Sequence, residues 1–224
     1  MNLYWGIFML TMLASWLVSA LFNSRMKKYS AIRTSMTGRE VAERMLRENG
    51  ITDVQVVCTG GILTDHYNPA NHTVNLSKEV YEGATLAAMA VAAHECGHAV
   101  QHAVGYAPLR MRTALVPVVT FSSKWMMWVI LAGMFVLQQF PQLMLFGIAL
   151  FAMTTLFSFI TLPVEINASV RAINWMEESM LVTREDLPKA SAALRAAAYT
   201  YVVAALSSLA SLLYYIAIYS GSRR

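Results

Sequence analysis

The pattern His-Glu-x-x-His occurs once in this 224-residue sequence, at His94, Glu95 and His98. On a helix, residues four positions apart lie one above the other, so the two imidazoles can direct nitrogens at one metal ion. Glu95 is rotated from His94 by about 100° and can hold a water molecule that the ion polarises. If the ion is zinc, this water supplies hydroxide near neutral pH and the glutamate takes its proton. The pattern therefore predicts metal-assisted hydrolysis.

The residues before the pattern strengthen this interpretation. A chain of this length contains the pattern by chance on the order of once in a hundred. The run from Leu86 to Ala93 has no polar side chain, and two histidines and a glutamate placed after it are costly unless something compensates them. The alternative is a pair of core histidines with local hydrogen bonds and an incidental Glu95. The context favours the metal site.

A catalytic zinc takes three protein ligands and leaves a fourth position open to water. His102 lies eight residues after His94, about 12 Å along a helix axis, and cannot share an ion with it. The remaining candidates are His66, His72 and the downstream carboxylates. Glu165 is the strongest, because it follows a long apolar segment, where a carboxylate is costly unless it is ligated or paired.

The element that carries the pattern is predicted to be one long helix over residues 77–104, closed by Gly105. Before it, Thr37 and Glu40 form an N-cap pattern for a helix over residues 38–48. Between the two helices there is room only for a small sheet. Its short strands are expected at residues 53–58, 62–65 and 73–76.

The composition predicts a membrane protein. The chain is 57% hydrophobic and 13% charged, whereas soluble domains carry roughly 25% charged residues. Between Ala114 and Pro163 the only charged residue is Lys124, which excludes a soluble globule and a disordered chain. Four apolar segments are near the roughly 20 residues that a helix needs to cross a bilayer. We expect transmembrane helices at residues 3–22, 116–137, 143–162 and 197–219.

The polar segments, residues 23–113 and 164–196, are expected in the cytoplasm, because basic residues near span ends stay on that side. The first holds the His-Glu-x-x-His helix, and the second is helical and holds Glu165. Only the C-terminal Arg223 and Arg224 disagree with this orientation. No basic stripe interleaved with aromatics occurs, so the net charge of +4 does not indicate nucleic-acid binding. The basic residues whose positions agree with the expected cytoplasmic orientation are Arg25, Lys27, Lys28, Arg33, Arg110, Arg112, Arg171 and Arg195.

Four motifs resemble those of the bacterial membrane zinc metallopeptidases of the YugP type. They are LTDHYNP at residues 63–69, HECGHAVQH at 94–102, GYAPLRMR at 105–112 and LPVEINAS at 162–169. The resemblance covers nearly the whole chain, including the order of spans and motifs. It is much more specific than the His-Glu-x-x-His pattern alone.

The resemblance implies a gluzincin-like site in which His94, His98 and Glu165 bind Zn²⁺ and Glu95 is the catalytic base. Such a site is similar to those of the HtpX-type heat-shock proteases and the CAAX prenyl proteases. These two families typically place an Asp four residues after the third ligand, where this chain has Ser169. The resemblance therefore leaves open which groups orient the ligands.

Other residues have two interpretations. Asp65, His66 and Tyr67 form either a strand edge that binds an extended peptide or a structural turn. Arg171 either steadies an oxyanion or meets a lipid headgroup. Cys96 is expected to pack as a small apolar residue rather than to bind the metal. Together with Cys58 it is too few for a disulfide scaffold.

We therefore expect a mostly α-helical integral membrane protein with four transmembrane helices and a small α+β, zincin-like cytoplasmic portion. The expected function is that of a multi-pass zinc metalloendopeptidase of the bacterial inner membrane, which hydrolyses peptide bonds at the cytoplasmic face. Its expected partners are the lipid bilayer and a protein or peptide substrate. A membrane-protein partner or a homo-oligomer is left open, and nucleic acid is not expected.

Two other classes remain as alternatives. One is a proteolytically silent, zinc-binding membrane adaptor, in which the metal would be structural and have no open position. The other is a small transporter or channel component, for which Lys124 would be the leading residue. Several ionisable groups within the spans would favour a transporter, and the sequence has only this one.

Overall fold

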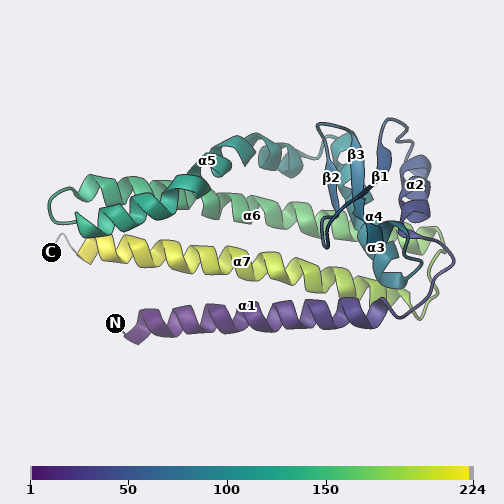
Figure 1. Cartoon of the computed structure of the whole chain (residues 1–224), viewed down its shortest axis with the longest axis horizontal. Helices are drawn as coiled ribbons and strands as arrows, with labels where there is room; N and C mark the ends of the chain where they lie inside the picture. Colours follow the sequence, from purple (N-terminus) through teal and green to yellow (C-terminus); the bar gives the residue numbers. More distant parts are fainter. Residues whose placement is uncertain (1, 222–224) are drawn as a thin grey trace. The chain divides into compact units, whose positions relative to one another are not determined.

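A computed structural model describes residues 2–221, so Arg223 and Arg224 lie outside the described part of the chain. The described residues form seven helices and three strands and are mostly helical (Figure 1). The elements in chain order are α1 (Asn2–Tyr29), α2 (Gly38–Glu48), β1 (Gln55–Thr59), β2 (His66–Asn68), β3 (Thr73–Ser77), α3 (Lys78–Tyr81), α4 (Leu86–Ala103), α5 (Ala107–Phe135), α6 (Pro141–Glu178) and α7 (Leu187–Gly221).

The chain divides into two compact units. The helical unit comprises residues 1–17, 110–162 and 200–224, and the site unit comprises residues 18–109 and 163–199. Among the described residues, α1, α5, α6 and α7 are long and apolar enough to cross a membrane. These helices are longer than the predicted spans, and all four contribute residues to both units. Which residues of each helix lie in a bilayer stays a prediction.

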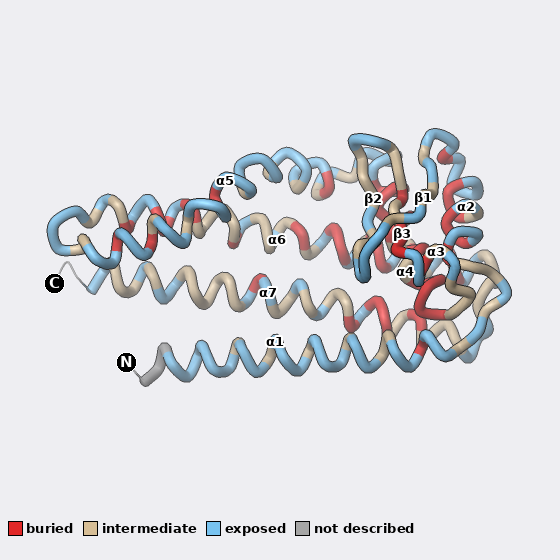
Figure 2. The backbone as a smooth tube through the Cα atoms, in the orientation of Figure 1, coloured by how far each residue is buried: buried red, intermediate tan, exposed pale blue. Residues whose placement is uncertain are grey.

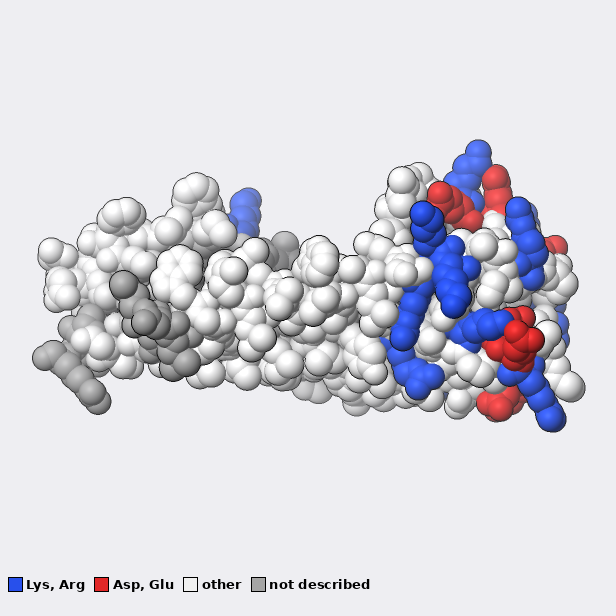
Figure 3. All heavy atoms as spheres, turned by 90° about the horizontal axis from the view of Figure 1, so that it is seen from below, with Lys and Arg blue, Asp and Glu red and all other residues white. Residues whose placement is uncertain are grey.

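In the helical unit, α5 and α6 pack closely against each other. A Cβ atom at Gly133 would lie 2.7 Å from the Cα of Met144, and one at Gly147 would lie 2.8 Å from Cγ1 of Ile130. Glycine permits these approaches because it has no side chain. The sequence of this unit contains no Asp or Glu. On the face seen in Figure 3, most of the charged side chains gather in one region, and one basic side chain lies apart from them.

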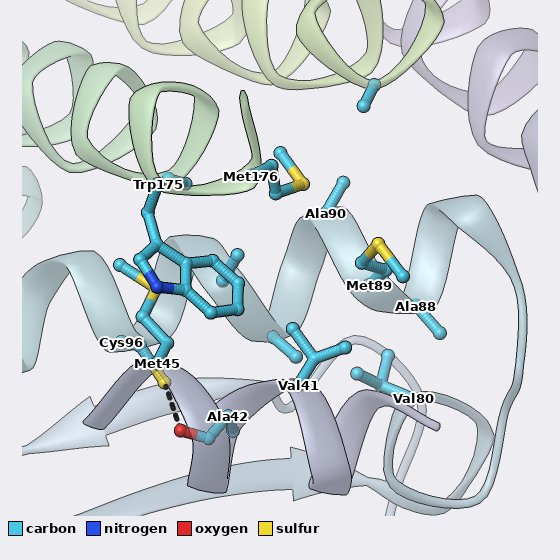
Figure 4. Close-up of a cluster of buried hydrophobic side chains, with 14 of the residues drawn as sticks. Val41, Ala42, Met45, Val80, Ala88, Met89, Ala90, Cys96, Trp175 and Met176 are labelled. Carbon is cyan, nitrogen blue, oxygen red and sulfur yellow. Dashed lines mark hydrogen bonds between the residues drawn. The ribbon is translucent and has the colours of Figure 1, made fainter. Parts of the chain in front are cut away.

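The core of the site unit lies between α2, α4 and the last turns of α6 (Figure 4). Val41 and Met45 of α2 belong to one cluster with Met89 of α4 and Met176 of α6, and all four side chains are buried. Much of α4 is buried (Figure 2). Burying apolar surface of this kind contributes roughly 25 cal/mol per Å². The helix that carries the two predicted histidine ligands is therefore packed on several sides.

Local signals place α2 as predicted. The Oε2 atom of Glu40 accepts from the backbone N of Thr37 at 2.7 Å, and the backbone N of Glu40 donates to Thr37 Oγ1 at 3.3 Å. This reciprocal capping box satisfies two helix-terminal donors. The helix spans the predicted residues, Gly38–Glu48. The predicted start is confirmed.

The prediction of one continuous helix over residues 77–104 is wrong. The chain forms the short helix α3, leaves the helical path at residues 82–85 and begins α4 at Leu86. Thr85 is the N-cap, and its Oγ1 accepts from the backbone N of Ala88 at 3.2 Å. At Gly83 a Cβ atom would lie 2.2 Å from the carbonyl oxygen of Glu79. A threonine at the N-cap position, such as Thr85, is a signal for the start of a helix.

The small predicted sheet is present, with three strands in the order β1-β3-β2. Strand β1 pairs parallel to β3, and β2 pairs antiparallel to β3 and forms one edge. The strand predicted at residues 62–65 is wrong, because Gly61 (φ 100°) and Leu63 (φ 58°) take left-handed conformations that do not continue a strand. The strand at this place starts later, at His66.

Candidate metal centre

Helices α4 and α6 bring three predicted metal ligands together from positions 71 residues apart. The Oε2 atom of Glu165 lies 3.3 Å from Nε2 of His94 and 3.6 Å from Nε2 of His98. One ligand atom from each residue lies within 4.8 Å of the others. His98 and Glu165 are buried, and the side chain of His94 is 14% exposed. The three donors therefore converge on one small volume, and His94 is the least buried of the three.

The other candidates for the third ligand have different partners. His66 Nδ1 lies 2.7 Å from the carbonyl oxygen of Thr64. His72 Nδ1 lies 2.6 Å from Oδ2 of Asp53. Among the described residues, only the group of His94, His98 and Glu165 has ligand atoms close enough to hold one ion. The geometry favours Glu165 over the two histidines.

Glycine inside the motif allows α6 to approach α4. A Cβ atom at Gly97 would lie 2.6 Å from the carbonyl oxygen of Ala168. Ala168 lies one helical turn after Glu165, on the same side of α6. Any side chain at Gly97 would separate the two backbones and move the carboxylate away from the histidines. Gly97 is a positional requirement that the sequence analysis did not identify.

Two polar residues contact the imidazole rings of the histidines at Nδ1. The Oγ atom of Ser169 lies 3.1 Å from Nδ1 of His94, and Oε1 of Gln101 lies 3.0 Å from Nδ1 of His98. Both rings therefore present Nε2 to Glu165. Partners of this kind usually fix the orientation of metal-binding histidines. Ser169 is the residue that supplies this contact to His94.

The electrostatics of the site favour a cation. Burial lowers the pKa of His98, but the hydrogen bond to Glu165 and the charges of Glu95 and Glu165 outweigh burial, so the pKa lies above its ordinary value. Two imidazole nitrogens and one carboxylate oxygen form a donor set typical of catalytic zinc sites. The residues present therefore fit a zinc ion.

Cys96 lies within the motif and contacts a different part of the site unit. Its buried Sγ donates to the carbonyl oxygen of Ala42 on α2, at 3.6 Å (Figure 4). Burial, and to a smaller extent the charge of Glu95, raises the pKa of this thiol far above its ordinary value. The side chain therefore stays a neutral thiol, in keeping with the expected packing role.

Glu95 is buried and contacts the edge strand β2. Its Oε2 atom accepts from the backbone N of Tyr67 at 3.1 Å. This N–H group therefore points away from β3 and toward the metal site. The phenol of the same Tyr67 lies 2.7 Å from Nδ1 of His102. Tyr67 thus contacts α4 through both its backbone and its side chain.

The other residues predicted to bind substrate have partners of their own. Asp65 Oδ1 accepts from the backbone N of Ser77 at 2.7 Å and from its Oγ at 3.0 Å, which joins the start of β2 to the end of β3. His66 is exposed. Arg171 donates from Nε to Oδ1 of Asn167 at 2.8 Å and borders a cavity beside Trp175. A direct role for Arg171 with an oxyanion or a lipid headgroup stays a prediction.

Comparison with known proteins agrees with this donor set. The family described as "Putative neutral zinc metallopeptidase" matches residues 4–220. The chain belongs to this family. It is also 42% identical over 202 residues to the "Putative membrane protease YugP" of Bacillus subtilis (strain 168), covering 89% of each chain. The predicted resemblance to the zinc metallopeptidases of the YugP type is therefore confirmed. No solved structure matches this chain.

Proposed function

We propose that this protein is a membrane-bound zinc metalloendopeptidase that hydrolyses peptide bonds of proteins or peptides at the cytoplasmic membrane face. One observation carries the proposal: Nε2 of His94, Nε2 of His98 and Oε2 of Glu165 converge, with Glu95 adjacent in the chain. Family membership adds zinc and peptide-bond hydrolysis to this geometry. The four long apolar helices support a multi-pass location in the bacterial inner membrane.

His94, His98 and Glu165 would hold the ion. Bound zinc supplies two things, a water molecule acidified toward neutral pH and polarisation of the scissile carbonyl. The carboxylate of Glu95 takes the proton from the attacking water and passes it to the leaving amine. The backbone N–H of Tyr67 holds this carboxylate through Oε2. Glu95 is therefore positioned before substrate arrives.

The edge strand β2 is the proposed substrate platform. Strand β2 has β3 on one side only, and its Tyr67 N–H faces Glu95. An extended peptide binds such an edge through main-chain hydrogen bonds. A substrate carbonyl that accepts from the Tyr67 N–H would replace Glu95 as acceptor. Substrate binding would then release the Glu95 carboxylate for proton transfer.

Replacing Tyr67 by proline tests this platform. Proline removes the N–H group without removing a hydrogen bond between β2 and β3, since that N–H faces Glu95. Tyr67→Ala is the matched control, because it removes the phenol and keeps the N–H. We expect a KM about 5- to 10-fold higher for Tyr67→Pro than for Tyr67→Ala, as for one lost hydrogen bond. Equal KM values for the two variants, measured on an extended peptide, would exclude this contact.

Metal removal tests the proposed function as a whole. We expect the protein, purified in detergent, to contain about one zinc per chain and to cleave unfolded protein or peptide substrates. A chelator should abolish cleavage, and added Zn²⁺ should restore it. The measurement is the cleavage rate against metal content. Retention of zinc without cleavage of any peptide in a diverse mixture would instead support the silent adaptor.

A further inference from the structure

We propose that Gln101 is a positioning residue that sets the tautomer of His98 and so directs the Nε2 lone pair of His98 at the metal. The inference rests on the proposed function, because it concerns a ligand of the same site. Gln101 is 0% exposed, although its amide is polar. It lies three residues after His98, on the same face of α4. Its amide contacts both His98 and α6.

The orientation of the Gln101 amide is determined by groups that have only one hydrogen-bonding role. The carbonyl oxygen of Val164 lies 2.8 Å from Nε2 of Gln101, and a carbonyl can only accept. The same Nε2 lies 3.0 Å from Oδ1 of Asn167. That oxygen is identified by Arg171, whose Nε donates to it at 2.8 Å and can only donate. Exchanging the oxygen and nitrogen positions of either amide would place two donors or two acceptors against each other.

The tautomer of His98 follows from this orientation. Because Nε2 of Gln101 faces α6, its Oε1 faces Nδ1 of His98, at 3.0 Å. An amide oxygen only accepts, so Nδ1 of His98 carries the proton. In a neutral imidazole the other nitrogen, Nε2, then has the free lone pair. This nitrogen faces Glu165.

The second histidine has no comparable constraint. Nδ1 of His94 contacts the hydroxyl of Ser169 at 3.1 Å, and a hydroxyl can donate or accept. The contact therefore orients the ring of His94 without selecting its tautomer. Arg171 also gains a role through this chain of contacts, since it holds Asn167, which in turn holds Gln101. It would act through these residues rather than on a reacting atom.

Two substitutions of similar size separate this role from a structural one. Gln101→Glu keeps an oxygen that accepts from His98 Nδ1 and changes the groups that face α6. Gln101→Met removes both kinds of contact. We expect Gln101→Met to weaken zinc binding about 10- to 100-fold, as for other residues that orient metal-binding histidines. We expect Gln101→Glu to bind zinc within about threefold of wild type, although both variants lower the Tm of the metal-free protein.

The measurements are the zinc Kd, by competition with a chromogenic chelator, and the Tm without metal. If Gln101→Met binds zinc as wild type does, or if Gln101→Glu loses as much affinity as Gln101→Met, the inference is wrong. These outcomes do not depend on cleavage. A wild-type protein that binds zinc and cleaves peptides while Gln101→Met keeps full affinity would contradict only this inference. A wild-type protein without zinc or cleavage would contradict the proposed function.

A second measurement uses only the wild-type chain. In ¹⁵N spectra of the zinc-loaded protein, we expect His98 to show a protonated Nδ1 that exchanges slowly, because the proton is buried against Gln101. Binding of zinc through Nδ1 of His98 would overturn the inference. This test remains valid if a Gln101 variant does not fold.

Discussion

Glu95→Gln is expected to lower the hydrolysis rate by about 10²- to 10⁴-fold, the usual contribution of a general base. The amide cannot take a proton from water, which removes the proposed step. It has nearly the same shape, and its oxygen can still accept from the Tyr67 N–H, a contact of 3.1 Å in the structure. Glu95 is not one of the three converging ligand residues. Zinc content and fold should therefore be preserved.

The measurement compares cleavage rate, zinc content and Tm in Glu95→Gln and wild type. Glu82→Gln is a matched control, because Glu82 is exposed between α3 and α4, and it should leave all three quantities unchanged. Glu95→Asp should give an intermediate rate. It keeps a carboxylate, but the side chain is one methylene shorter, so the carboxylate lies away from the position it has in wild type. An unchanged cleavage rate in Glu95→Gln would refute the assignment of the base.

Glu165→Ala is expected to weaken zinc binding by about 100-fold or more. Zinc sites with four protein ligands bind with roughly 10–16 kcal/mol, or about 3 kcal/mol per ligand. Glu165 is the only carboxylate among the three converging donors, and its Oε2 lies within 3.6 Å of both histidine Nε2 atoms. Its removal takes away the negative charge and one donor together. Cleavage should be lost with the metal.

The control for Glu165→Ala is Glu177→Ala, which changes an exposed carboxylate on the same helix. The measurements are metal content after dialysis and the zinc Kd. Glu95→Gln should keep zinc and lose hydrolysis, whereas Glu165→Ala should lose both. This difference separates the base from the ligand. Full zinc affinity in Glu165→Ala would indicate that His66 or His72 is the third ligand. In the structure, these residues contact Thr64 and Asp53, respectively.

Features that depend on neighbours in the chain were predictable. The four long helices follow from apolar runs, and α2 follows from the capping pattern at Thr37 and Glu40. The apolar run does not show the break between α3 and α4, which depends on Gly83 and on the N-cap Thr85. A hydrophobic pattern does not show where β2 starts, because it carries no signal for the left-handed conformations at Gly61 and Leu63.

The sequence by itself determined the half of the site that lies on one helix. Helix periodicity alone places His94 and His98 on one face with Glu95 beside them. The packing of α6 against α4 at Gly97 decided that Glu165 joins them. The tertiary structure also brought the Tyr67 N–H to Glu95, and Val164 and Asn167 of α6 to the buried amide of Gln101. Such contacts depend on backbone approach between distant segments, which no local spacing encodes.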